Sequence, residues 1–480
     1  MKKNQKVLLV NPFPLLASAI NEATIYPPLG IAYIAGYLES KGVECRIIDA
    51  NLFRLGQTEI LKRIKEFGAD VIGISTNIVT IRAAIKLSQL IKNHLPVKVI
   101  LGGPSADASI KNTLQESLAD CIVIGEGERI SWNLVNNGFD LKNTKGIVYI
   151  EDSEIKINPR EDYIKDLDEL PFPAWHLLPN LKLYMSKSRK RPVATMITSR
   201  GCPYRCIFCH KSIFGNQFRK RSVQNILDEI DLLRKNFKVR QIDLVDDNFT
   251  LDIPRAEKIL DTITERNYNI ALSLPNGVRA DRLTPQLVRK MKLAGVYRAG
   301  LGIESGDEMI LENIGKDLKL KHATEAIKMF RKENIIVSGF FMLGLPDDTR
   351  QTMQKTIDFA IKVNPHVANF SITVPLPGTE LFDVIKKRGR FVKSVEEGIS
   401  RGFFSISNGY FEIGELKKED VFFYQRQAYR KFYIRPFKLL EVLLTIRTFQ
   451  EFKWIFTIAL PLLRGLISPK REDDTSPENE

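Results

Sequence analysis

Cysteine and histidine are scarce in this chain of 480 residues, which contains only five of each. So few cysteines do not support a disulfide-stabilised secreted fold and are typical of a protein of the reducing cytoplasm. Long apolar runs are also lacking. The most apolar stretch of the C-terminal region, residues 454–467, has fourteen residues, fewer than the roughly 20 that span a bilayer. The apolar run near the N-terminus is too short for a signal peptide and predicts a first buried strand instead.

Acidic residues are outnumbered, since 57 Asp and Glu face 71 Lys and Arg and leave a net charge of +14. Such an excess of positive charge is typical of proteins that bind a nucleic acid or an anionic membrane surface. The sequence shows no helix-turn-helix and no nucleic-acid-binding repeat, so we expect no nucleic-acid partner. Residues 421–470 hold nine Lys or Arg against two Glu, a net charge of +7 and half of the excess.

Three of the five cysteines, Cys202, Cys206 and Cys209, fall within eight positions in a C-x3-C-x2-C pattern. This spacing on one loop indicates a metal site rather than disulfide bonds. Structural zinc sites and 4Fe–4S clusters usually take four protein ligands, so three ligands leave one position open for a small molecule. The alternative is a zinc knuckle completed by His210. The other two cysteines are isolated in apolar runs and are expected to be core residues.

The stretch GCPYRCIFC resembles the cluster-binding loop of the radical S-adenosylmethionine (SAM) superfamily. The resemblance implies that Cys202, Cys206 and Cys209 ligate three irons of a 4Fe–4S cluster, while SAM chelates the fourth. It also implies that the reduced cluster cleaves SAM to a 5′-deoxyadenosyl radical, which abstracts hydrogen from an unactivated carbon. Phe208 is expected to shield the cluster and to pass its backbone near the adenine. An external electron donor of flavodoxin or ferredoxin type follows from this chemistry.

Apolar strand-like runs alternate with helical segments over residues 1–145, which predicts a doubly wound, Rossmann-like α/β domain with a mostly parallel sheet. Ligands of such sheets lie at the carboxyl ends of the strands. No G-x-G-x-x-G follows the first strand, so a dinucleotide site is disfavoured. The candidate cofactor-binding residues in the strand-end loops are Ser75, Gly102, Gly103 and Glu126.

The stretch YPPLGIAYIAGYLESKG and the GGPSA loop resemble the cobalamin-binding domain of cobalamin-dependent radical SAM enzymes. The resemblance implies cobalamin as a further cofactor. A D-x-H-x-x-G motif is absent, so we expect no histidine beneath the cobalt. The alternative is an α/β domain that has kept the fold and lost the cofactor.

Residues 146–191 are predicted to form a linker, with a hairpin followed by a proline-rich strap in which Trp175 anchors the packing between domains. Residues 192–390 repeat a strand–helix unit six times, which predicts a partial (β/α)6 barrel. By resemblance to the family's strand-end elements, the residues expected near SAM are Asp246, Asp247, Glu304, Ser305 and Gly344. Arg279 is expected to meet a carboxylate of SAM or substrate, with a structural salt bridge as the alternative.

Residues 391–480 are predicted to form a mainly helical extension. Residues 454–467 have basic flanks and suit an interfacial helix on anionic lipid, which would make the protein peripheral to the membrane. The alternative is a helical cap that packs on the barrel.

The resemblance implies an enzyme that methylates an unactivated carbon of a small molecule, and the cysteine content indicates the cytoplasm. The apolar C-terminal extension and its expected contact with lipid favour a hydrophobic substrate. Radical cyclisation or rearrangement is the alternative reaction. A non-catalytic sensor that depends on cobalamin or a cluster is the alternative of another class. A methylthiotransferase is disfavoured, because the N-terminal domain lacks three cysteines for a second cluster.

Overall fold

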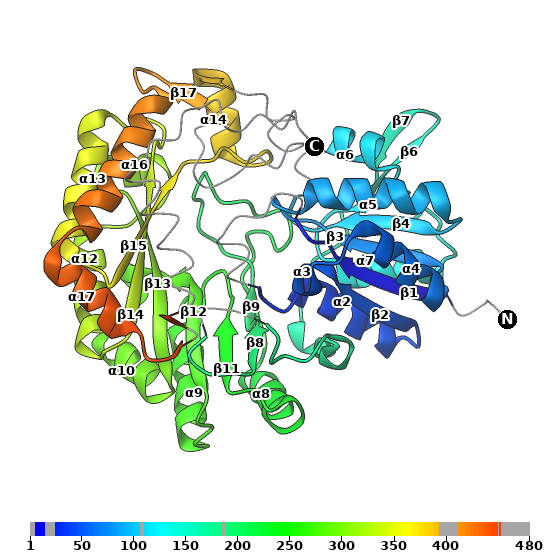
Figure 1. Ribbon diagram of the computed structural model, residues 1–480, viewed down its shortest axis with the longest axis horizontal. Helices are drawn as coiled ribbons and strands as arrows, with labels where there is room; N and C mark the ends of the chain where they lie inside the picture. Colours follow the sequence, from blue (N-terminus) through cyan, green and yellow to red (C-terminus); the bar gives the residue numbers. More distant parts are fainter. Residues whose placement is uncertain are drawn as a thin grey trace.

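The computed structural model describes residues 5–14, 25–105, 110–184, 188–392, 411–449 and 451–452. These residues form two α/β units that lie side by side, each built on one large sheet (Figure 1). The predicted doubly wound domain and the predicted partial barrel are both confirmed. None of the described helices combines the length and apolarity that crossing a bilayer requires.

The first unit has a seven-stranded sheet in the order β2-β1-β3-β4-β5-β6-β7, whose first five strands are parallel. Its strands are β1 (Lys6–Asn11), β2 (Glu44–Asp49), β3 (Val71–Ser75), β4 (Lys98–Gly102), β5 (Cys121–Val123), β6 (Ile147–Glu151) and β7 (Glu154–Ile157). Its helices are α2 (Leu29–Ser40), α3 (Ala50–Phe53), α4 (Gln57–Phe67), α5 (Ile81–His94), α6 (Ile110–Ser117) and α7 (Gly127–Asn136).

Helices cover both faces of this sheet, so its central strands β1, β3, β4 and β5 are buried on both sides and are mainly apolar rather than alternating. Two separate core clusters fill the two faces. Cys45 and Cys121 are buried in one of them, as predicted. Helix α4 is capped by Gly68, whose amide donates to the carbonyls of Ile64 and Lys65. Gly68 adopts φ +68°, a conformation that glycine reaches without steric cost.

The predicted hairpin of residues 146–191 forms, but it does not belong to a linker. Strand β6 pairs antiparallel with β5, and β7 pairs with β6, so the hairpin extends the first sheet. The strap that follows contains two short 3₁₀ helices, η1 (Leu167–Glu169) and η2 (Trp175–Leu177). Trp175 is 2% exposed and shares a buried cluster with Leu29 and Tyr33 of α2 and with the barrel core, as its predicted anchoring role requires.

The second unit has a six-stranded, wholly parallel sheet in the order β15-β14-β13-β12-β11-β8. Its strands are β8 (Val193–Met196), β11 (Gln241–Leu244), β12 (Ala271–Val278), β13 (Val296–Glu304), β14 (Ile336–Leu343) and β15 (Val367–Ile372). Its helices are α8 (Val223–Phe237), α9 (Ile253–Glu265), η3 (Ala280–Arg282), α10 (Pro285–Leu293), α11 (Glu308–Asn313), α12 (Leu320–Lys332), α13 (Arg350–Val363) and α14 (Glu380–Arg388).

The C-terminal extension begins with the antiparallel pair β16 (Gly389–Phe391) and β17 (Phe411–Ile413), followed by α16 (Lys418–Tyr433) and α17 (Pro436–Thr445). Helix α16 packs on α13 and on β15, the edge strand of the barrel sheet (Figure 1). Tyr433 Oη accepts from the Ala368 amide at 3.0 Å and donates to its carbonyl at 2.9 Å, and Gln425 donates to the Phe370 carbonyl. Helix α16 therefore covers the open edge of the barrel sheet. Residues 454–467, predicted to be interfacial, lie outside the described residues.

Candidate active site

The three clustered cysteines lie on a loop of residues 201–218 whose base is closed by a short antiparallel ribbon. Strand β9 (Ser199–Arg200) pairs with β10 (Arg219–Lys220) across this base. Gly201 starts the loop with φ +83°, and a Cβ there would lie 2.2 Å from the Gln217 carbonyl oxygen. Only glycine therefore fits at this point. Residues 193–201 are divided into β8, which belongs to the barrel, and β9, which belongs to the loop.

Two consecutive aspartates at the end of β11 hold the start of this loop. Asp246 is 2% exposed and accepts from the Thr198 amide at 2.6 Å and from the hydroxyls of Thr198 and Ser199 at 2.5 and 2.6 Å. Burial raises the pKa of Asp246, and these hydrogen bonds oppose the rise. Asp247 accepts from the Gly201 amide at 3.1 Å and remains exposed. Asp246 is thus fully engaged in positioning the loop, whereas Asp247 keeps an oxygen for a ligand.

The far side of the loop rests on residues 314–317, between α11 and α12. The Ile207 amide donates to the Ile314 carbonyl at 3.1 Å. Arg279 donates to the carbonyls of Lys316 and Asp317 and to the Asp281 carboxylate, all at 2.9 Å. Its guanidinium also stacks 3.7 Å from the centre of the Tyr204 ring on the cysteine loop. The structure thus shows Arg279 in the salt bridge that was the alternative to ligand binding, with four of its five N–H groups already engaged.

Glu304 ends β13 in an unusual backbone conformation, with φ +70°. Its carboxylate pairs with Lys316 at 2.8 Å, and both side chains are about nine-tenths buried. A Cβ at Gly302 would lie 2.7 Å from the Glu304 carboxylate, so glycine makes room for the pair. A non-glycine residue with positive φ is strained and is retained where the surroundings over-determine it, often at functional sites. Lys316 is the partner that a buried Glu304 requires.

Phe208 lies at the turn of the cysteine loop, half-buried against the barrel core. The Ile207 carbonyl, which precedes it, accepts from the Leu381 amide of α14 at 2.9 Å. Ser305 is 1% exposed and its hydroxyl contacts Thr356 of α13 at 3.2 Å. The cysteine loop is therefore fixed at Phe208, whereas Ser305 faces a helix rather than the strand-end space.

Gly344 ends β14 with φ +77°, and a Cβ there would meet Val421 of α16 at 3.0 Å. The amides of Gly344 and Leu345 donate to Asp348, which is 7% exposed. Burial raises the pKa of Asp348 to about 6. The C-terminal extension thus covers one side of Gly344, and a ligand could approach this residue only from the other side.

In the first unit, the structure brings three predicted residues together at the carboxyl edge of the sheet. Ser75 pairs with Gly102 across β3 and β4, and Thr76 donates to the Gly102 carbonyl from its amide at 2.7 Å. Gly103 has φ +119°, and a Cβ there would lie 2.2 Å from the Thr76 carbonyl oxygen. At Gly125, after β5, the position of a Cβ faces open space. Gly103 thus allows the loops after β3 and β4 to pack closely, and Gly125 leaves open space at the same edge of the sheet, where a bulky ligand fits.

Glu126, the fourth predicted residue of this unit, faces the barrel instead of a ligand. Its carboxylate accepts from Arg200 at 2.6 Å, from Arg219 at 2.7 Å and from the Ile164 amide at 2.9 Å. Arg200 also pairs with Glu128 at 2.7 Å. These four charged side chains are all buried. The network joins the loop after β5 to β9 and β10, at the base of the cysteine loop.

A second contact joins the two carboxyl edges. Ile81, after β3, is buried, and half-buried Val374 and Leu376, which follow β15, pack against the cluster it forms with Ile78 and Ile85. Since the loops after β5 and β3 contact the loops around β9 and after β15, the carboxyl ends of the two sheets face each other (Figure 1).

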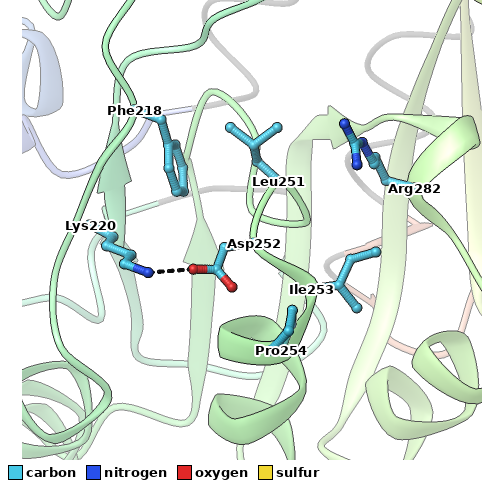
Figure 2. Close-up of a pocket in the computed structure, with 7 residues that line it drawn as sticks. All are labelled: Phe218, Lys220, Leu251, Asp252, Ile253, Pro254 and Arg282. Atoms are coloured by element: carbon cyan, nitrogen blue, oxygen red, sulfur yellow. Dashed lines mark hydrogen bonds and ion pairs between the residues drawn. The ribbon is translucent and has the colours of Figure 1, made fainter.

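An open pocket of about 550 Å³ lies beside β10 and the start of α9 (Figure 2). Lys220 and Asp252 form an ion pair at 2.5 Å on one side of it, and Arg282 lies on the other side and donates to the Tyr204 hydroxyl at 3.0 Å. No residue that lines it is among the predicted site residues, so we assign it no ligand.

Three free thiols on one clamped loop fit a 4Fe–4S cluster, in which each thiolate binds its own iron. A single ion would instead need its ligands to converge, and no three His, Cys, Asp or Glu side chains do so within the described residues. His210, the proposed fourth ligand of a zinc knuckle, contacts the Ser212 hydroxyl through Nδ1 at 3.1 Å.

Sequence reasoning missed Arg200, Arg219, Glu128 and Lys316, because none belongs to a recognisable motif. One signal was available for Arg200: an arginine directly before a cysteine loop, next to residues predicted to be buried, needs a carboxylate partner.

Two family models match the chain. Residues 196–360 match the Radical SAM superfamily, and residues 18–135 match the B12 binding domain. An uncharacterized methyltransferase of Pyrococcus horikoshii is 31% identical over 92% of this chain and 95% of its own length. Cytidylyl-2-hydroxyethylphosphonate methyltransferase of Streptomyces wedmorensis is 29% identical over 81% of this chain and 83% of its own.

A solved structure shares the arrangement of both units. The radical SAM methyltransferase TsrM of Kitasatospora setae, with cobalamin and a 4Fe–4S cluster bound, aligns with a TM-score of 0.72 over 97% of this chain and 99% of its own. The identity is 16%, so this likeness concerns the fold.

Proposed function

The chain belongs to the radical SAM superfamily and carries a B12-binding domain, and on this premise we propose that it is a cobalamin-dependent methyltransferase. Its substrate is a small molecule that is methylated at an unactivated carbon. The enzyme requires an external reductant. Two relatives that are named methyltransferases and match four-fifths of this chain or more support the proposal.

The observation that carries the proposal is the apposition of the two carboxyl edges. Ligands of parallel α/β sheets lie at the carboxyl ends of the strands. Here the edge that contains Gly102 and Gly103 faces the barrel edge that contains the cysteine loop, joined by the buried Glu126–Arg200 pair at 2.6 Å. A ligand at the first edge and a ligand at the second therefore share one space between the units, as a direct transfer between them requires.

Three cysteines would hold the cluster, Asp247 and Glu304 would meet polar groups of SAM, and the loops after β3, β4 and β5 would hold cobalamin. When bound, these groups supply a carbon-centred radical by reductive cleavage of SAM and a methyl group to combine with the substrate radical. The protein's own part is positioning and exclusion of water. Asp246 and Arg279 fix the cysteine loop, and apolar Val374 and Leu376 help to close the space between the units.

The finer partner predictions also remain proposals. The apolar side chains around Leu376 favour a hydrophobic substrate. The electron donor is of flavodoxin or ferredoxin type, because the reaction consumes one electron at low potential. We further propose that the enzyme acts in the reducing cytoplasm, with which the free thiols of all five cysteines agree.

Reconstitution of the full chain with iron and sulfide, followed by incubation with SAM and a strong reductant, tests the enzyme proposal. We expect 5′-deoxyadenosine from the wild type and from Cys45→Ala, a matched control at an isolated buried cysteine. Cys206→Ala should form none. Equal yields from wild type and Cys206→Ala would favour the non-catalytic sensor.

Two further measurements separate the remaining alternatives. Protein supplied with hydroxocobalamin should retain corrin absorbance after gel filtration, and its loss would mean that the first unit has kept the fold without the cofactor. Methylation consumes a second SAM and should release S-adenosylhomocysteine together with 5′-deoxyadenosine. Formation of 5′-deoxyadenosine alone, with a candidate substrate consumed, would favour cyclisation or rearrangement.

A further inference from the structure

Helix α17 lies on the outside of the barrel, next to α16 (Figure 1), and turns its charged residues inward. Lys438 is 3% exposed and its ammonium group donates to the Pro365 carbonyl and to Glu441. Glu441 also pairs with Arg331 of α12 at 2.5 Å. A surface helix normally buries its apolar stripe and exposes its charges. The orientation of α17 is therefore the reverse of the usual one.

The outward side of α17 is apolar. Phe437, Leu440 and Leu444 are 87%, 53% and 61% exposed and lie three and four residues apart, on one face of the helix. Further large apolar side chains are exposed before, within and after the helix, namely Ile434, Leu439, Leu443, Phe449 and Phe452. We call these eight side chains the α17 patch. Monomeric proteins rarely expose such a group unless it meets a partner or a membrane.

The exposed charged side chains of residues 426–452, the stretch that contains α17, are all basic. Arg426 and Arg430 are exposed on α16, which leads into α17, and Arg447 is exposed just after it. None of these three guanidinium groups has a partner among the described residues. The two acidic residues of the same stretch are turned inward, since Glu441 binds Lys438 and the buried Glu451 accepts from the Arg447 amide at 2.8 Å. The apolar side chains of the α17 patch are thus flanked along the chain by exposed basic residues and by no exposed acidic residue of the same stretch.

This charge pattern distinguishes between two occupants. A second copy of the chain would place the patch against itself across a two-fold axis, which would bring unpaired arginines towards unpaired arginines. An anionic lipid surface instead attracts the arginines and accepts the Phe and Leu side chains at the boundary between headgroups and acyl chains. We propose that the α17 patch docks the protein onto the surface of a membrane that contains anionic phospholipid.

Flotation of the full-length protein with vesicles tests the proposal. Wild type should float with vesicles of phosphatidylcholine and phosphatidylglycerol, should float poorly with phosphatidylcholine alone, and should be released by salt. Leu440→Glu/Leu444→Glu should lower the partition coefficient at least about tenfold, because two apolar side chains no longer enter the lipid. Ile157→Glu is the matched control, since Ile157 is 66% exposed on β7 of the first unit, and it should float like the wild type.

Three results would overturn the proposal. The first is undiminished flotation of Leu440→Glu/Leu444→Glu, with circular dichroism showing that the variant is folded. The second is complete loss of flotation when the chain is ended after Phe452, because α17 remains and residues 453–480 would then be the anchor. The third is a wild-type dimer that Leu440→Glu/Leu444→Glu converts to a monomer without any vesicle binding, which would assign the patch to a second copy.

Discussion

Glu126→Gln is expected to destabilise the contact between the two units by about 3 kcal/mol. Glu126 neutralises two guanidinium groups, those of Arg200 and Arg219, and its side chain is only 4% exposed. Glutamine keeps the volume and one acceptor oxygen but removes the charge. Glu128 would then be the single carboxylate left for two buried arginines. Removing one partner of a buried ion pair typically costs about 3–5 kcal/mol, because the remaining charge is left uncompensated.

Urea unfolding, followed by tryptophan fluorescence, measures this cost. Trp175 lies in the core that joins the strap to the barrel, and its indole donates to Glu229 at 3.2 Å, so its emission reports on loss of that core. A chain with two sheets need not unfold in one step, so the variants are compared at the same transition. The matched control is Glu169→Gln, since Glu169 is 62% exposed and pairs with Arg129 at 3.2 Å. An exposed pair of this kind is worth less than about 1 kcal/mol.

A double-variant cycle distinguishes an ion pair from simple loss of packing. Arg219→Gln alone leaves Glu126 with one fewer donor, and combining it with Glu126→Gln removes both members of one pair. The double variant should therefore cost less than the sum of the two single variants. The reasoning is refuted if Glu126→Gln costs no more than Glu169→Gln, or if the two substitutions add without coupling.

Three further predictions concern single positions. Tyr433→Phe should lower the free energy of unfolding by about 1–2 kcal/mol in urea, because the edge strand β15 loses both bonds to this hydroxyl. Burial, with a smaller contribution from the positive charge of Arg331, lowers the pKa of His366 to about 4. Neutral His366 therefore contributes fully to the stability of the folded protein above pH 6.5, the pKa of an unfolded histidine, and this contribution is lost as the pH falls towards 4. That loss amounts to about 3 kcal/mol, and His366→Gln should flatten this part of the stability–pH curve; an unchanged slope would contradict the assignment. Gly201→Ala should lower the iron bound after reconstitution, whereas Gly42→Ala, at a similar φ of +81° with open space around it, should leave it unchanged.

The sequence was sufficient for the features that depend on local signals. Alternating apolar runs and helices predict both sheets, because a strand buried on two faces and a helix between two such strands each leave a pattern within a few residues. The start of α10 at Pro285 and the end of α4 at Gly68 follow from proline and glycine at helix ends. The spacing of three cysteines predicts the cluster loop for the same reason.

Pairings between distant segments could not be predicted in this way. The residues of β6 and β7 are sufficient to predict a hairpin. They do not indicate whether this hairpin pairs with β5 of the first sheet, as the structure shows, or forms a separate element. Glu126 and Arg200 are 74 residues apart, and only the fold brings them to 2.6 Å. The glycines beside Glu126 favoured a ligand role for the whole loop, although its carboxylate serves the domain contact. Lys438 illustrates the same limit. A lysine in an apolar helix is expected to be exposed, and only the fold brings the Pro365 carbonyl to Lys438 and Glu441, so that the ammonium group is satisfied while buried.

The Glu126 network also explains why the cysteine loop belongs to both units. The loop has two fixed ends, Arg200 and Arg219, which pair with each other across β9 and β10. Both arginines are neutralised from the first unit. Asp246 and Asp247 of the barrel accept hydrogen bonds from Ser199 and Gly201, on either side of Arg200. Separation of the units would remove both counter-charges from the arginines at the base of the loop. The position of the three thiols therefore depends on docking of the B12-binding domain, and a barrel expressed without residues 1–158 should bind iron less well than the full chain.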